Sequence, residues 1–404
     1  MTLKTRFTTA FATGAVLLNA LAPLSFAQST NIQISGNGAF SDNTANVSTS
    51  NDVRVTQDNN ANINNDVDVD ANTGNNDANF NTGGDTTVRT GDANVDVSVT
   101  NVANKNVASV TNCCSQSTDV LISGNGAYSD NTVRLDSDNN VRLTQDNYAR
   151  INNDVDVDAN TGDNDAKFNT GGDVAIVTGD ADVDVDLLTM VNANSAMIGG
   201  GDGDGGTLSA RILDNGAFSD NSIRLDFDND VRLNQDNRAH VDNDVDVDAD
   251  TGRNDANFNT GGDVDVVTGD ANVDVNVDTL ANFNAANIDD CGCFSDVLAE
   301  IDGNGAFSDN SIRADFDNDL RLSQDNDLRL HNDVDVDADT GHNDAEFNTG
   351  SNGDTSIDTG DVNSGVDLNN HSNVNLLNAG SDMLDDLEFS FDFDELLAML
   401  MAHV

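Results

Sequence analysis

Proline is almost missing from this chain of 404 residues, because its only proline, Pro23, lies close to the N-terminus. Proline has no N–H group to donate to a β-ladder, so every backbone position beyond residue 23 is able to pair. Tryptophan is absent, and the lysine and glutamate that disordered linkers favour are rare. The acid is nearly all aspartate, accompanied by Asn, Gly, Thr and Val. Asp, Asn and Gly favour tight turns while Val and Thr favour strands, so the composition indicates β-structure.

Basic residues are also scarce. The chain has 17 Lys and Arg against 72 Asp and Glu, which gives a formal net charge of −55. A nucleic-acid partner is excluded, because such binding needs a basic surface, and anionic lipid surfaces are disfavoured for the same reason. A chain this acidic repels itself when it becomes compact. We therefore expect it to be disordered, to work in high salt, or to be neutralised by cations.

The N-terminus has the features of a secretory signal peptide. Lys4 and Arg6 are followed by an apolar stretch, Ala10 to Leu24, and by a small-x-small cleavage motif at Ser25-Phe-Ala27. The apolar stretch is too short for a confident membrane span. We predict that residues 1–27 are removed, and that the mature protein is secreted to the cell exterior or cell surface without a transmembrane segment.

The chain has four cysteines, in two close pairs. A secreted protein can keep disulfides, and four cysteines allow three pairings among which the sequence does not choose. Zinc binding is disfavoured because no histidine is near and the spacing is not C-x-x-C. Free thiols are the remaining alternative. The disulfide candidates are Cys113, Cys114, Cys291 and Cys293.

One unit of sequence occurs four times. The block Gly-Asn-Gly-Ala-Phe-Ser-Asp-Asn at residues 36–43 returns, with small changes, at steps of 88, 90 and 89 residues. Four further stations follow it in the same order in every unit. The predicted divisions are repeat 1 at 28–120, repeat 2 at 121–210, repeat 3 at 211–300, repeat 4 at 301–380 and a C-terminal segment at 381–404.

The C-terminal segment differs from the repeats. Asp394 to Ala402 is predicted to form a short amphipathic helix, with its acids at the N-terminal end where the helix dipole favours them. It is too short to span a bilayer. We expect it to cap the last repeat or to serve as a docking tail.

Apolar and polar residues alternate with period two within each unit, as in half-buried strands. Turn signals at Thr73-Gly74, Thr82-Gly83 and Thr90-Gly91 lie 9 and 8 residues apart. Strands of about five residues between such turns predict an all-β fold, an elongated β-solenoid or β-helix in which each short strand is one side of a coil. Disorder without cations and an array of four separate β-sandwiches are the alternatives. The sandwiches are disfavoured because each unit has few large apolar residues for a core of its own.

Aspartates alternate with valines at one station of each unit, as in Asp244-Val-Asp-Val-Asp-Ala-Asp250. On a strand the valines face one side and the carboxylates the other. Stacked repeats would bring like charges within about 4.8 Å, and Ca²⁺ with its oxygen ligands would relieve the repulsion. A solvated face neutralised by ambient salt is the alternative. The candidate calcium ligands are Asp66, Asp68, Asp70, Asp154, Asp156, Asp158, Asp244, Asp246, Asp248, Asp250, Asp333, Asp335, Asp337 and Asp339.

Two stretches carry resemblances to secreted bacterial β-solenoid repeat proteins. Gly261–Asp270 (GGDVDVVTGD) resembles the glycine-aspartate turns of RTX-type calcium β-rolls, which implies bound Ca²⁺. Leu143–Ile151 (LTQDNYARI) is similar in its Gln/Asn/Ala rhythm to the curlin repeats of bacterial curli fibres, which implies polar ladders and polymerisation. The ladder residues would be Gln57, Gln145, Gln235 and Gln324 with Asn59, Asn147, Asn237 and Asn326.

Arginine and aromatic residues also recur at fixed stations. We expect the arginines to pair with carboxylates on the outer strand face. The aromatic residues are expected to stack inside the coil, with a carbohydrate-binding platform as the alternative. The arginines are Arg54, Arg142, Arg232 and Arg321; the aromatic sets are Phe40, Tyr128, Phe218 and Phe307, and Phe80, Phe168, Phe258 and Phe347.

No catalytic signature is present. The five histidines fall at unmatched stations, and neither G-x-S-x-G nor H-E-x-x-H occurs. We expect no enzyme activity, and a polysaccharide-acting enzyme on a β-helix is only a remote alternative. The leading hypothesis is a secreted structural or adhesive protein, stabilised by calcium, that binds cell-surface or matrix components, with other copies of itself as an alternative partner. The alternative is a curlin-like, fibre-forming (functional amyloid) subunit.

Overall fold

The structure is a computed structural model that describes residues 5–8, 18–21, 27–110, 115–199, 206–288, 294–350 and 353–379. These residues form strands and turns and no helix. The four cysteines and the predicted C-terminal helix lie outside the described residues. None of the described residues belongs to a helix that could cross a membrane.

Each repeat forms four strands in the same order. In repeat 1 these are β3 (Ala27–Ser35), β4 (Asp42–Asn72), β5 (Thr86–Arg89) and β6 (Ala93–Val110). The predicted leader adds β1 (Thr5–Thr8) and β2 (Leu18–Leu21). The later repeats contribute β7 (Ser115–Ser123), β8 (Asp130–Asn160), β9 (Val174–Val177) and β10 (Ala181–Ile198); β11 (Gly206–Leu213), β12 (Asp220–Asp250), β13 (Val264–Val267) and β14 (Ala271–Ile288); and β15 (Phe294–Asp302), β16 (Asp309–Asp339), β17 (Thr355–Asp358) and β18 (Val362–Ala379).

The four repeats lie side by side as four layers, which we number 1 to 4 in chain order. Equivalent strands pair in parallel, so the sheets run β3-β7-β11-β15, β4-β8-β12-β16, β5-β9-β13-β17 and β6-β10-β14-β18. The register follows the sequence alignment of the repeats: Asp66 pairs with Asp154, Asp154 with Asp244, and Asp244 with Asp333. A position in the repeat therefore forms a column of four side chains across the layers.

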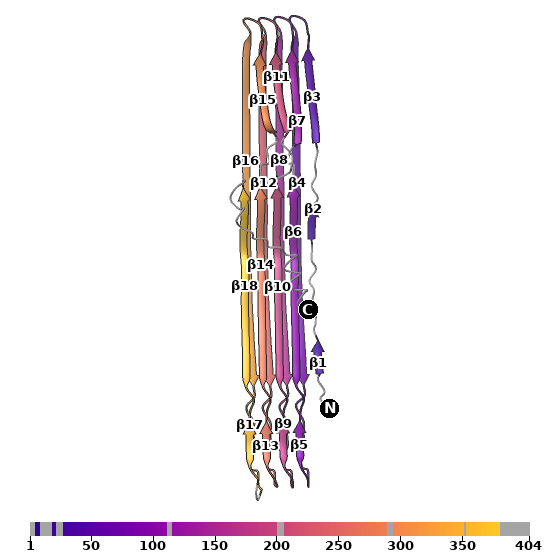
Figure 1. Cartoon of the computed structure of the whole chain (residues 1–404), viewed down its shortest axis with the longest axis vertical. Helices are drawn as coiled ribbons and strands as arrows, with labels where there is room; N and C mark the ends of the chain where they lie inside the picture. The colour runs from indigo at the N-terminus through magenta and orange to yellow at the C-terminus, as the bar shows by residue number, and fades with distance from the viewer. Residues whose placement is uncertain are drawn as a thin grey trace.

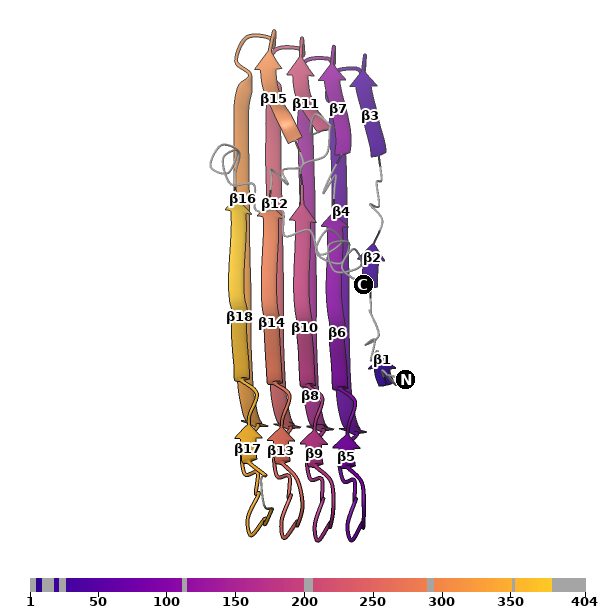
Figure 2. The ribbon, with the colours of Figure 1, turned by 60° about the horizontal axis from the view of Figure 1, so that its bottom comes forward.

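The long axis of the molecule follows the strands, and the layers stack across it (Figures 1 and 2). β4 and its equivalents have 31 residues, which is a length of about 100 Å at about 3.3 Å per residue. The prediction of short strands on the sides of small coils is therefore wrong, because one whole repeat makes one layer. Residues 42–72 alternate without a Gly or Pro that would end the strand. The closely spaced turn signals lie only in residues 73–91, which connect β4 to β6 and contain the short β5.

The core lies between facing sheets and runs through all layers. The β4-type strands pack against the β3-type strands at one end and against the β6-type strands over the rest. Val155 and Val245 are fully buried in one cluster with Val185 and Val275 of the opposite sheet. Each cluster contains residues from several repeats, so the alternative of four separate sandwiches is wrong. A layer too thin to fold alone is covered by its neighbours.

Candidate functional site

The predicted calcium ligands lie in outward columns on the β4-type strands. In each Asp-Val-Asp-Val-Asp-Ala segment the apolar residues point into the core, and the aspartates lie on the outer face, where they are exposed or half-buried. Neighbouring layers lie about 4.8 Å apart, so carboxylates repeat at that spacing down each column. The columns are Asp66, Asp154, Asp244 and Asp333; Asp68, Asp156, Asp246 and Asp335; and Asp70, Asp158, Asp248 and Asp337.

Three carboxylates of these columns, Asp158, Asp246 and Asp248, have a raised pKa. Burial against neighbouring side chains and then repulsion from Asp156 and Asp335 raise the pKa of Asp246 above its ordinary value. Burial and then Asp337 raise the pKa of Asp248. Burial followed by Asp248 raises the pKa of Asp158. Each of these three carboxylates thus holds its proton more tightly than a free aspartate, and a nearby cation would reverse that effect.

Asp250 and Asp339 occupy a different environment from the other twelve predicted ligands. They follow Asn72 and Asn160 in one column at the end of the long strand. Asp250 is only 2% exposed; its Oδ1 accepts a hydrogen bond from the Gly252 amide at 2.7 Å and its Oδ2 lies 2.9 Å from Arg253 Nε. Burial nevertheless raises the pKa of Asp250 to about 6, against the lowering effects of the Gly252 amide and Arg253.

Asp339 is partnered more strongly than Asp250. Its Oδ1 accepts a hydrogen bond from the Gly341 amide at 2.6 Å, and its Oδ2 lies 2.6 Å from His342 Nδ1. Burial favours a higher pKa, but the Gly341 amide and His342 outweigh it and lower the pKa of Asp339. His342 therefore has a structural role that sequence reasoning missed. Its position three residues after the column aspartate, like that of Arg253, was the available signal.

Within the described part of the chain, no three His, Cys, Asp or Glu side chains converge as a ready-made metal site. The fourteen aspartates are instead arrayed in lines, and the structure does not bring them together at one point. What they offer is a surface of evenly spaced oxygen ligands. A cation there would be shared between carboxylates of adjacent layers.

Amide side chains form ladders inside the fold. Gln145 Nε2 donates to Gln57 Oε1 at 2.7 Å, and Gln235 and Gln324 continue the column at 2.8 Å each. Each glutamine also donates to a backbone carbonyl of the facing sheet, such as Ser195 O, 3.0 Å from Gln145 Nε2. The predicted Asn59, Asn147, Asn237 and Asn326 form a second ladder with contacts of 3.1, 3.0 and 3.1 Å. The predicted amide columns are thus present, and they are buried in layers 1, 2 and 3.

A third ladder from the facing sheet interlocks with the second, and sequence reasoning missed it. Asn147 Nδ2 donates to Asn194 Oδ1 at 2.8 Å, and Asn194 Nδ2 donates to Asn237 Oδ1 at 2.9 Å, so the two ladders form one zigzag. The signal was an Asn-x-Asn pair at the same station of every repeat. The third ladder consists of Asn106, Asn194, Asn284 and Asn375.

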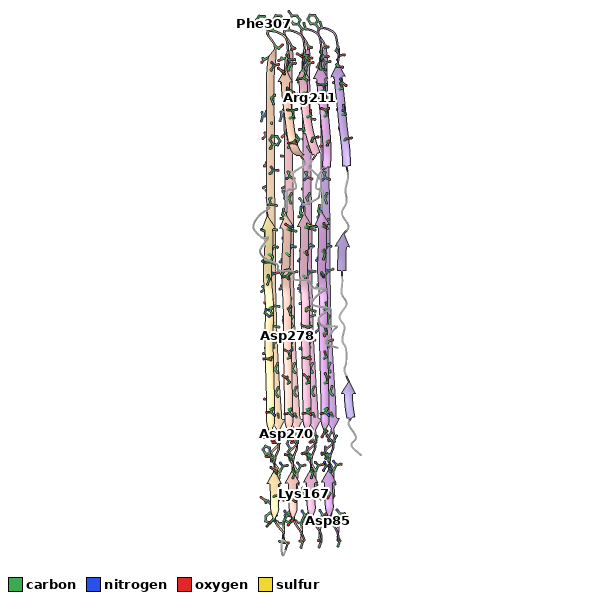
Figure 3. The ribbon with its side chains drawn as sticks, viewed as in Figure 1. Asp85, Lys167, Arg211, Asp270, Asp278 and Phe307 are labelled. Carbon is green, nitrogen blue, oxygen red and sulfur yellow. The ribbon has the colours of Figure 1, made fainter. Side chains whose placement is uncertain are left out.

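The aromatic columns stack as predicted, but their predicted place inside the coil is wrong. Rings within each column lie 5.0–5.1 Å apart and nearly parallel. All eight residues have positive φ, at turns that direct the rings outward, and Phe307 projects from one tip of the molecule in Figure 3. Because the rings cover one another's faces, the columns present ring edges rather than the flat platform that stacks on a sugar.

Several ion pairs lie on the outer surface. Arg232 and Arg321 pair with the aspartate two residues before them, Asp230 at 2.7 Å and Asp319 at 2.6 Å, which confirms the expected pairing for these two arginines. Lys167 bridges two layers, because its Nζ contacts Asp165 at 2.8 Å in its own layer and also Asp255 in the next. The ammonium group of Lys167 is thus a cation that the chain itself places between two layers.

Comparison with protein-family models, with curated proteins and with solved structures found no match.

Proposed function

We propose that this protein is a secreted structural β-solenoid of the cell surface or extracellular matrix, whose acidic faces are neutralised by Ca²⁺. The observation that carries the proposal is that one repeat forms one layer, with aspartate columns outside and apolar and amide columns inside. A solenoid of this kind offers long, regular surfaces. Its partners would be cell-surface or matrix components that contact the acidic faces.

Repulsion between the carboxylates of adjacent layers supports the calcium part of the proposal. Carboxylates about 4.8 Å apart in adjacent layers repel one another, and a cation between them removes that cost. Ca²⁺ tolerates loose geometry with six to eight oxygen ligands, so lines of carboxylates suit it better than they suit Mg²⁺, which needs a strict octahedron.

Circular dichroism of the secreted chain tests the proposal. We expect β-structure to form or to gain thermal stability on adding Ca²⁺, with a smaller effect of Mg²⁺ at equal concentration and of NaCl at equal ionic strength. The triple variant D244N/D246N/D248N removes the layer 3 carboxylate from each of the three columns, and we expect it to need less Ca²⁺ for the same stability. A chain that stays a random coil in millimolar Ca²⁺ and in molar salt would refute the proposal.

A second candidate function is a fibre-forming subunit. The specific observation in its favour is that the glutamine ladder runs unbroken through all four layers, from Gln57 to Gln324, with the asparagine ladder beside it. Repeating amide ladders are typical of cross-β fibres. Thioflavin fluorescence and electron microscopy over days, in salt that screens the acidic faces, test this function independently of the calcium experiment.

A further inference from the structure

Layer 4 ends the stack with its interior side chains uncovered. Ile312 is 49% exposed, whereas Ile223 at the same position in layer 3 is 1% exposed. Leu320, Val366 and Leu368 are exposed in the same way. The terminal repeats of a solenoid need a polar cap to remain soluble as single molecules. Among the described residues no strand covers the outer edges of β16, β17 and β18.

Layer 1 presents the matching edge. Among the described residues β3, β4 and β5 have a neighbouring strand on one side only. Phe40 is 78% exposed and Phe307, at the far end of its column, is 82% exposed, whereas Phe218 between them is 47% exposed. The same difference holds for Phe80 and Phe347 against Phe258. Each column thus ends in a free ring face at both ends of the stack.

One column of charges distinguishes the two ends. Arg89 pairs with Val177, Val177 with Val267, and Val267 with Asp358, so this column is charged only in its first and last layers, and with opposite signs. A second copy stacked in the same register would place Arg89 beside Asp358. Layer 1 is also less acidic than layer 4 at two positions, because it has Ser48 and Ser50 where layer 4 has Asp315 and Asp317.

We infer that layer 4 of one copy docks on layer 1 of a second copy in the register of the internal layers, with Asp358 beside Arg89. The inference rests on the fibre-forming candidate function and adds to it the polarity and register of the joint. The occupant is a second copy because its layer 1 continues the apolar, amide and aromatic columns that layer 4 leaves open. The predicted leader partly occupies this edge, since β1 and β2 pair with β6. We therefore expect assembly of the secreted form, after removal of residues 1–27.

Two glycines allow the joint to be blocked without disturbing the layers. A Cβ on Gly126 would overlap the backbone of Ala39 in the preceding layer, whereas a Cβ on Gly38 meets nothing within 4 Å. A Cβ on Gly252 would overlap Gly341 O in the following layer, whereas one on Gly341 meets only Asp339 Oδ1, at 3.2 Å. A Cβ on Gly38 is free in the single molecule, and one on Gly341 requires only a small shift of the Asp339 side chain, whereas both would overlap backbone in the joint.

The glycine experiment uses the secreted chain and its variants G38A and G341A, followed by sedimentation and seeded growth in screening salt. We expect each variant to keep the parent's circular dichroism and thermal midpoint and to lose most of its fibre growth. G365A is the matched control, because Gly365 shares its column with Asp96, Asp184 and Asp274, which all carry a Cβ. Growth of G38A and G341A at the parent's rate would overturn the proposed joint.

The charge experiment tests the register. We expect D358R and R89D each to slow growth roughly tenfold, because like charges then meet across the joint. The double variant R89D/D358R should restore growth, since the pair is only exchanged. D265R, one layer inward on the adjacent strand, should grow as the parent does. A parent that stays a single molecule would reject the inference. Fibres that form only after residues 381–404 are removed would show that the chain's own tail covers layer 4, and would reject it as well.

Discussion

Two aspartates at one position of the repeat show how burial and the partners of a carboxylate compete to set its pKa. Asp250 and Asp339 share a column, and each accepts a backbone amide at the same turn. The pKa of Asp250 rises to about 6 because burial dominates, whereas the pKa of Asp339 falls because the Gly341 amide and His342 outweigh its burial. Both carboxylates have a basic partner three positions on, Arg253 or His342, so the deeper burial of Asp250 accounts for the opposite directions of the two pKa shifts.

We predict that D250N stabilises the fold at neutral pH. The folded-state pKa of Asp250 lies above its ordinary value of 3.8, so ionisation costs stability as the pH rises from 3.8 to about 6. Asparagine keeps the turn bond, as Asn160 does with the Gly162 amide at 2.8 Å. We expect a gain of roughly 1–3 kcal/mol above pH 6 that vanishes below pH 4, measured by denaturant unfolding.

D339N in the next layer is the matched control and should have the opposite sign. The pKa of Asp339 is lowered, so its contribution is present above its unfolded-state pKa and is lost as the pH falls through the folded-state value. We expect D339N to destabilise the chain at pH 7 and to match the parent in strong acid. A gain at pH 7 from both variants would contradict this account.

At the scale of elements, periodicity predicted what each position does but not how long a strand is. The outward aspartates and the Gln57 and Asn59 columns follow from alternation and from aligning the repeats. Strand length did not follow, because Asn and Asp are turn residues by propensity yet here serve as ladder members inside a strand. The outward direction of the aromatic columns was predicted wrongly, because a Phe with positive φ is rare and leaves no mark in the sequence.

We predict that the amide zigzag is a large part of the layer-to-layer stability. Asn147 is buried; it donates to Asn194 and Asn237 and accepts from Asn59 at 3.1 Å and Asn106 at 2.9 Å. N147L leaves these amides short of partners, and we expect a loss of roughly 3 kcal/mol or more in urea unfolding. N64A, which removes only an exposed bond from Asn152, should cost less than about 0.5 kcal/mol.

At the scale of the whole molecule, charge opposes the fold that the interior favours. Burial and then neighbouring aspartates raise the pKa of Asp146, Asp184 and Asp228, and also that of three column residues, Asp158, Asp246 and Asp248. The folded state therefore binds more protons than the unfolded chain in mildly acidic solution. Stability from these groups is full below the unfolded pKa and is lost as the pH rises through their raised folded-state values.

We predict that, in low salt and with chelator, the thermal midpoint is higher at pH 4 than at pH 7. Most acidic proteins behave in the opposite way, because their carboxylates are stabilised in the folded state. Millimolar Ca²⁺ should raise the midpoint at pH 7 and have a smaller effect at pH 4, because protons compete with Ca²⁺ for the carboxylates. A midpoint that falls on acidification, with or without Ca²⁺, would mean that the columns are not strained.

The length of β4 and its equivalents has a mechanical consequence. Each boundary between layers is bridged by backbone hydrogen bonds along strands of 31 and 18 residues and two shorter ones. A pull along the stacking direction loads these bonds together, whereas a pull on one tip would break them one after another. A filament of such layers would resist tension strongly for its mass and peel easily from an edge, and each added molecule would lengthen it by only about 19 Å.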